Sequence, residues 1–186
     1  KMYASYGVTT VQDGMVGKPL FELLKYASAN GLLKLDVVGY ADIMTAADLF
    51  EEERAYANRY TGHLKMGGYK IFLDGSPQGR TAWMTKPYEG EENYCGYPIH
   101  TDEELNHYIE LALEKKQQLL AHCNGDAAAE QYIGQFEKAL SKRTDKDLHR
   151  AVMVHAQLVR KDQLQRMAAI GMIPSFFVAS PEAKRS

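Results

Sequence analysis

Three side chains that can bind a metal ion or carry protons stand in or directly after apolar runs of the sequence. His122 and His155 each follow such a run, and Lys70 lies inside a third. The ends of parallel strands share one edge of a sheet, and neighbouring strands lie about 5 Å apart. Because Zn–N bonds are about 2.0–2.1 Å long, two imidazoles at that edge can bind one ion. The alternative is a pair of structural histidines with satisfied hydrogen bonds.

Lys70 is unusual because it stands in the strongly apolar segment Tyr69–Leu73. Burial of an ammonium group lowers its pKa and favours the neutral amine. A neutral amine can act as a base, form a Schiff base or take up CO2 to become a carbamate. The alternative is a head group that reaches solvent or an acid at the end of the strand.

Other polar residues follow the same apolar runs. Asp74, after the lysine segment, can hydrogen-bond a substrate or another group of the site, or it can begin a turn. Arg80, in the same loop, suits a carboxylate or carbonyl of a substrate, or it can form an ion pair within the loop. Asn124 and Gln157 can hydrogen-bond the histidines and fix their tautomers. Asp13, which also precedes a glycine, is expected to begin a turn.

The remaining cysteine and histidines are assigned no chemistry. Cys123 is next to His122 and should point to the opposite face of the strand, so the two do not form a nucleophile pair. The other histidines are expected at the surface: His63, His100, His107 and His149.

Short apolar segments alternate with helical patterns along the chain, which predicts an α/β fold. The expected strands are 9–13, 35–40, 69–73, 119–121, 151–154 and 172–178. Helical spacing predicts helices over 20–30, 45–56, 101–113, 126–140 and 164–170, with capping residues at Thr45, Thr101 and Asp126, and a first helix that ends near Gly7. Residues 74–100 form a long loop, which is typical of a functional lid or an insert.

The strands lack polar–apolar alternation, as expected for a parallel sheet covered on both faces. Repeats of roughly 30 residues fit βα units, in an open sheet or a barrel. The sequence has no G-x-G-x-x-G and no Walker motif, and we therefore favour the barrel.

Composition excludes several classes of function. The net charge of −2 gives no reason to expect a nucleic acid or an anionic membrane as partner. No apolar run approaches the roughly 18–20 residues of a membrane span. Two cysteines, Cys95 and Cys123, form no disulfide framework and favour a reducing compartment, which predicts a cytoplasmic protein.

Four segments together resemble the amidohydrolase superfamily, and most closely its YtcJ-like branch, which includes N-substituted formamide deformylases. The segments begin at Gly7 (GVTTVQDG), Lys70 (KIFLDGS, followed by Arg80-Thr81-Ala82), His122 (HCNGDAA) and Val154 (VHAQ). They occur in order over nearly the whole chain. Each motif is modest alone, but the ordered set is fairly specific.

The resemblance implies a (β/α)8 barrel beside a small β-sandwich, and a metal centre. It assigns Lys70 to strand four, where the lysine is often carboxylated and bridges two metals, and His122 and His155 to metal ligands on strands five and six. The metal, expected to be zinc, would activate a water molecule for attack on the substrate carbonyl.

The sequence departs from the family pattern in two ways. It lacks the strand-one H-x-H pair and the strand-eight aspartate that acts as general base. In addition, a histidine expected near Ser180 is absent. We therefore expect residues 1–186 to form one partial barrel domain, about strands two to seven, without the sandwich.

The expected function is that of a fragment of a hydrolase acting on amide-like C–N bonds of small molecules. The fragment itself should bind metal weakly or not at all, be inactive, and associate through its unpaired strand edges. One alternative is a non-metal barrel enzyme with Lys70 as Schiff-base or general-base residue. Another is a barrel-derived domain that binds without catalysis.

Overall fold

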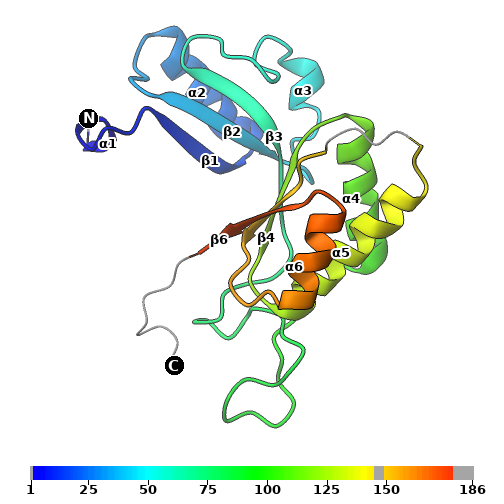
Figure 1. The fold of residues 1–186 in the computed structure, drawn as a ribbon. Coiled ribbons are helices and arrows are strands. Elements are labelled where there is room, and N and C mark those ends of the chain that lie inside the picture. Colours follow the sequence, from blue (N-terminus) through cyan, green and yellow to red (C-terminus); the bar gives the residue numbers. More distant parts are fainter. Residues whose placement is uncertain (1, 145–148, 178–186) are drawn as a thin grey trace. The chain divides into compact units, whose positions relative to one another are not determined.

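The computed structural model describes residues 2–144 and 149–177 of the 186-residue chain. These residues form two compact units, Lys1–Ile71 and Phe72–Ser186, each with parallel strands and helices (Figure 1). The first unit contains α1 (Met2–Ser5), β1 (Thr10–Val16), α2 (Lys18–Ala29), β2 (Asp36–Asp42), α3 (Leu49–Glu52) and nearly all of β3 (Leu64–Phe72). The second contains α4 (Asp102–Glu114), β4 (Leu119–Cys123), α5 (Asp126–Ser141), β5 (Val152–His155), α6 (Lys161–Ala169) and β6 (Ile173–Phe176).

The strands of each unit pair in parallel and in chain order. In the first unit β2 pairs with β1 and β3, and in the second β5 pairs with β4 and β6. The predicted α/β class with parallel strands is confirmed. Six strands among the described residues are fewer than the eight of a complete (β/α)8 barrel.

The second unit has a layer of helices along its strands, and α4, α5 and α6 lie side by side (Figure 1). Helix α5 is the centre of this layer, because it packs against both α4 and α6. Apolar residues at helical spacing bury most of the helix. Its buried apolar residues are Ala127, Ala128, Ala129, Tyr132, Ile133, Phe136 and Ala139. The capping box predicted at Thr101 and Glu104 is confirmed, with both of its hydrogen bonds present at the start of α4.

Several expectations about single elements are wrong. Asp13 and Gly14 do not turn the chain, because β1 continues to Val16, although Asp13 Oδ1 accepts a hydrogen bond from the Met15 amide within it. That strand is not buried as expected, since only Val16 is enclosed, and β2 alternates between buried and half-buried residues. Thr45 caps no helix: its hydroxyl donates to Asp42, and α3 is a single turn that starts only at Leu49.

Other local predictions are confirmed. Helix α2 has its proline in the first turn and ends at Ala29 with Asn30 as its C-cap, and Gly7 at φ +77° follows α1. Helix α6 is followed by Gly171, also at positive φ. Residues 74–100 contain no helix or strand. Val178, expected in the last strand, lies outside the described residues.

Candidate metal-binding site

His122 and His155 lie next to each other at the ends of two paired strands. In the register of β4 and β5, His122 is opposite Val154 and Cys123 is opposite His155. The imidazole centroids are 4.7 Å apart with the rings nearly perpendicular, and the Phe72 ring centroid lies 4.8 Å from that of His122. The structure thus places the two predicted histidines together, while Cys123 is fully buried.

The backbone at the second histidine has an uncommon conformation. His155 and Ala156 have φ of +76° and +44°, values that non-glycine residues adopt rarely and at a cost of order 1–3 kcal/mol. Backbone hydrogen bonds hold this turn: Ala156 N donates to Cys123 O, and Phe177 N donates to His155 O at 2.7 Å. Such strain is concentrated at functional sites in proteins.

The His122 ring is oriented by the carbonyl oxygen of Gly75. His122 Nε2 lies 2.9 Å from Gly75 O, and Asn124 Nδ2 donates to the same oxygen at 2.8 Å. Because a carbonyl only accepts, Nε2 must carry the hydrogen. The neutral ring then has its lone pair on Nδ1. The 3.1 Å separation of Asn124 Nδ2 from His122 Nε2 follows from two donors that share one acceptor.

Asp74 directly precedes Gly75 in the sequence, and it is 1% exposed. Its Oδ1 accepts from Asn124 N at 3.0 Å, and its Oδ2 accepts from Gly125 N at 2.7 Å and from Trp83 N at 3.1 Å. Burial raises the pKa of this carboxyl group, while the three amide hydrogen bonds oppose that rise. Both oxygens are thus used to join the end of β4 to the loop after β3.

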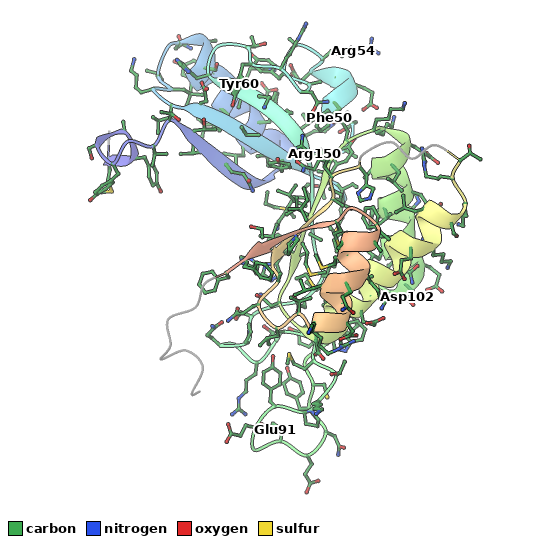
Figure 2. All side chains as sticks on the ribbon, in the orientation of Figure 1. Phe50, Arg54, Tyr60, Glu91, Asp102 and Arg150 are labelled. Atoms are coloured by element: carbon green, nitrogen blue, oxygen red, sulfur yellow. The ribbon has the colours of Figure 1, made fainter. Side chains whose placement is uncertain are left out.

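Arg80 is on the exposed surface of that loop. Its Nη1 pairs with Glu91 at 2.7 Å, with side chains 54% and 41% exposed, and Figure 2 shows Glu91 at the outer end of the loop. This is the ion pair named above as the alternative to substrate binding. Gln157 is half-buried in the turn after β5.

Lys70 belongs to the first unit and is 5% exposed within β3. Its backbone oxygen accepts from Ile43 N, and burial lowers the pKa of its ammonium group to about 8. A larger fraction of neutral amine is therefore present near neutral pH than for an ordinary lysine. The predicted meeting of Lys70 with the two histidines stays a prediction.

The histidine pair fits part of a metal centre. Two imidazoles supply two of the four ligands that zinc normally takes in proteins. Within residues 2–144 and 149–177, no group of three or more His, Cys, Asp or Glu side chains is placed to hold one ion. Among the described side chains, the two imidazoles therefore fit part of the coordination shell of a metal ion.

Sequence reasoning missed several contributors to this region. The Gly75 carbonyl is a backbone group that no residue type reveals. His100, predicted at the surface, is 5% exposed, because its ring packs edge-on against Tyr108. Asp126, predicted as the cap of α5, is instead the first residue of that helix after the N-cap Gly125, and its carboxylate binds Thr85 and Arg160.

Comparison with known proteins agrees with the resemblance seen in the sequence. The amidohydrolase family model matches residues 1–184. The Bacillus subtilis protein "Putative amidohydrolase YtcJ" is 31% identical over 138 residues, which are 73% of this chain and 25% of that protein. A crystal structure of an uncharacterized metal-dependent hydrolase from Pyrococcus furiosus is similar over 94% of this chain and 35% of that one, with a TM-score of 0.78 and 28% identity.

The counterpart from Pyrococcus horikoshii gives the same TM-score and identity and is covered over 34% of its length. The chain thus spans between a quarter and about a third of these relatives. In the part of the chain that the structure describes, no helix is long and apolar enough to cross a membrane. With the fold of an incomplete barrel and a family match over nearly its whole length, this chain belongs to the amidohydrolase family.

Proposed function

We propose that this chain forms part of the active site of a metal-dependent hydrolase that cleaves amide-like C–N bonds in small molecules. The observation that supports this most is the hydrogen bond from His122 Nε2 to Gly75 O. Metal-binding histidines typically donate their other ring N–H to a backbone carbonyl or a carboxylate, which fixes the tautomer. His122 has this arrangement, and in this proposal Nδ1 is the ligand atom.

In this proposal Lys70, His122 and His155 hold a divalent metal, with zinc as the expected ion. When bound, the metal supplies an activated water molecule and polarises the substrate carbonyl. Gly75 O keeps the proton on Nε2 of His122, and Asn124 shares that acceptor. Asp74 holds the end of β4 against the loop after β3, so that His122 keeps its direction.

The lowered pKa of Lys70 supports carboxylation, because only a neutral amine reacts with CO2. The same observation supports the alternative of Schiff-base or general-base chemistry at Lys70 without a metal. Intact mass under native conditions and borohydride trapping with a carbonyl substrate separate the two. A mass gain of one CO2 supports the metal centre, and covalent trapping at Lys70 supports the alternative.

The remaining ligands and the general base are expected outside residues 1–186. We therefore propose that these residues alone bind metal weakly and are inactive. A cytoplasmic location, expected from the cysteine content, also stays a prediction.

The test is hydrolysis of N-substituted formamides and related amides by the full-length protein. Activity should be lost on treatment with a chelator, return with zinc and be abolished by His122→Asn. His63→Asn is the matched control, because His63 is an exposed histidine paired with Asp36 in the first unit. Hydrolysis that survives both the chelator and His122→Asn would contradict the proposal.

A further inference from the structure

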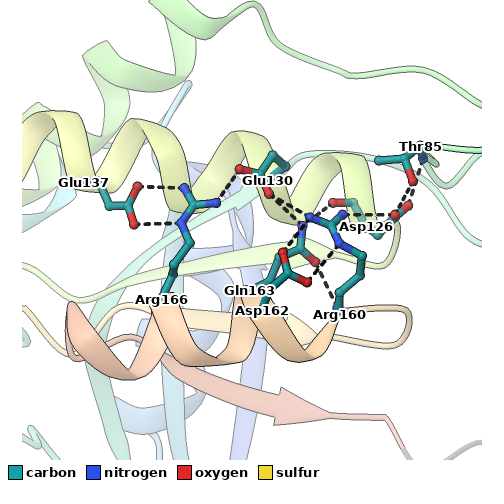
Figure 3. A network of polar contacts seen from close by, with 8 residues as sticks. All are labelled: Thr85, Asp126, Glu130, Glu137, Arg160, Asp162, Gln163 and Arg166. Atoms are coloured by element: carbon teal, nitrogen blue, oxygen red, sulfur yellow. Dashed lines mark hydrogen bonds and ion pairs between the residues drawn. The ribbon is translucent and has the colours of Figure 1, made fainter.

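The loop of residues 74–100 is fastened to the start of α5 by Asp126. Thr85 N donates to Asp126 Oδ1 at 2.9 Å, and the Thr85 hydroxyl donates to Asp126 Oδ2 (Figure 3). The Asp126 side chain is only 10% exposed. Burial alone would raise the pKa of this carboxyl group, but the hydrogen bonds from Thr85 and Arg160 lower it below its ordinary value.

Arg160, which follows β5, connects a third segment of the chain to the Asp126 carboxylate. It stands at the N-cap of α6, in the segment that follows His155, and its Nη1 donates to Asp126 Oδ2 at 3.2 Å. The same guanidinium pairs with Glu130 and Asp162. Figure 3 shows Asp126 linked to both Thr85 and Arg160. Asp126 therefore joins the segments that follow β3, β4 and β5.

A short chain of contacts leads from Thr85 to the His122 ring. Two residues before Thr85, Trp83 N donates to Asp74, and Trp83 O accepts from Ala127 N at 3.2 Å in the first turn of α5. Asp74 is followed directly by Gly75, whose carbonyl accepts the His122 Nε2 proton.

An acidic residue in the first turn of a helix is common, because it favours the helix dipole. Asp126 differs from that ordinary case in where its oxygens point. Both accept from Thr85, which is 41 residues away in sequence.

We propose that Asp126 is a positioning residue, which fixes the loop of residues 74–100 through Thr85 and thereby holds Gly75 O against the His122 ring. Arg160 links the loop after His155 to the same carboxylate, and we call the group of Thr85, Asp126 and Arg160 the clasp. The last step, the effect on His122 as a metal ligand, rests on the proposed function, whereas the fastening of the loop does not.

The first arm of the test measures amide hydrogen exchange of the loop in the metal-free, full-length protein. Asp126→Ala and Thr85→Val should speed exchange of residues 79–99 at least tenfold. Because Thr85 is exposed, Thr85→Val leaves the core intact. Asp126→Asn should retain most protection, since its oxygen can accept from Thr85 N and its amide can donate to Thr85 Oγ.

Arg166→Gln is the matched control. Arg166 belongs to the same network (Figure 3), but its hydrogen bonds to described residues go to Glu130 and Glu137 and not to Asp126 or the loop. It should therefore leave exchange of the loop unchanged. Equal exchange in Thr85→Val, Asp126→Ala and Arg166→Gln would overturn the clasp.

The second arm measures zinc affinity by competition with a chromophoric chelator. Loss of the group that orients a metal-binding histidine typically costs 10–100-fold in affinity, and Asp126→Ala and Thr85→Val should approach that loss, with recovery in Asp126→Asn. A loop that exchanges faster while zinc affinity stays within twofold would overturn the link to His122. Wild-type protein that binds no zinc would contradict the proposed function and this link, while the exchange arm still decides the clasp.

Discussion

Asp74 gives the sharpest stability prediction, because one buried carboxylate accepts three backbone hydrogen bonds. Asparagine has a single oxygen at this position. If that oxygen replaces Oδ2, it still accepts from Trp83 N and Gly125 N, but the amide group then faces the Asn124 N–H. One charge-assisted bond is lost, which is worth about 1.5–3 kcal/mol, and the other two lose their ionic part. We expect Asp74→Asn to lower the free energy of unfolding by about 2–4 kcal/mol.

Urea unfolding followed by fluorescence measures this directly, because Trp83 is the only tryptophan of the 186-residue chain and its amide is one of the three donors. Asp162→Asn is the matched control. Its side chain is 60% exposed and pairs with Arg160, so the change should cost less than about 1 kcal/mol. Equal losses in the two variants would refute the assignment of Asp74 as the group that joins β4 to the loop.

Three further predictions concern packing, pH and assembly. Gly125→Ala should strongly destabilise the chain, because a Cβ there would lie 1.9 Å from Trp83 O, whereas Gly134→Ala, in an open position of α5, should stabilise it by about 0.5–1 kcal/mol in thermal unfolding. His149 accepts from Ala151 N and donates to Ile170 O, and burial lowers the pKa of its imidazole. The stability that the neutral ring contributes should be full above the unfolded pKa of about 6.5 and should be lost as pH falls through the lower folded pKa. The free energies of unfolding of wild type and His149→Gln, measured in urea, should therefore converge at acidic pH. Strand β6 exposes Ile173 and Phe176. We therefore expect the 186-residue chain to form dimers or larger assemblies in light scattering at micromolar concentration. A monomer at that concentration would contradict this expectation.

The sequence predicted the elements that depend on local patterns. The Thr101 capping box, the helical stripe of α5 and the apolar run before His122 all act over a few residues, and the structure has each of them. The prediction that Thr45 caps a helix was wrong: residues 43–45 form a turn, in which the Thr45 hydroxyl donates to Asp42 three residues earlier.

Contacts between distant segments were out of reach of such patterns. The Thr85–Asp126 bond joins residues 41 apart, and the orienting group of His122 is a backbone carbonyl 47 residues away. Asp126 gave a visible signal, an acid at the start of a helix after Asn-Gly, but that signal points to a cap as readily as to a distant partner. The order of Lys70, His122 and His155 along the chain was visible in the sequence, and the structure brings the two histidines together.

The most direct test of the central claim is the metal content of the full-length protein, purified without chelators and measured by mass spectrometry of the elements. We expect at least one zinc or similar divalent ion per chain in wild type and in the His63→Asn control. Most of that metal should be lost in His122→Asn and in His155→Asn, because the two rings 4.7 Å apart are proposed to share the ion. Full metal content in both histidine variants, or none in the wild-type protein, would contradict the central claim.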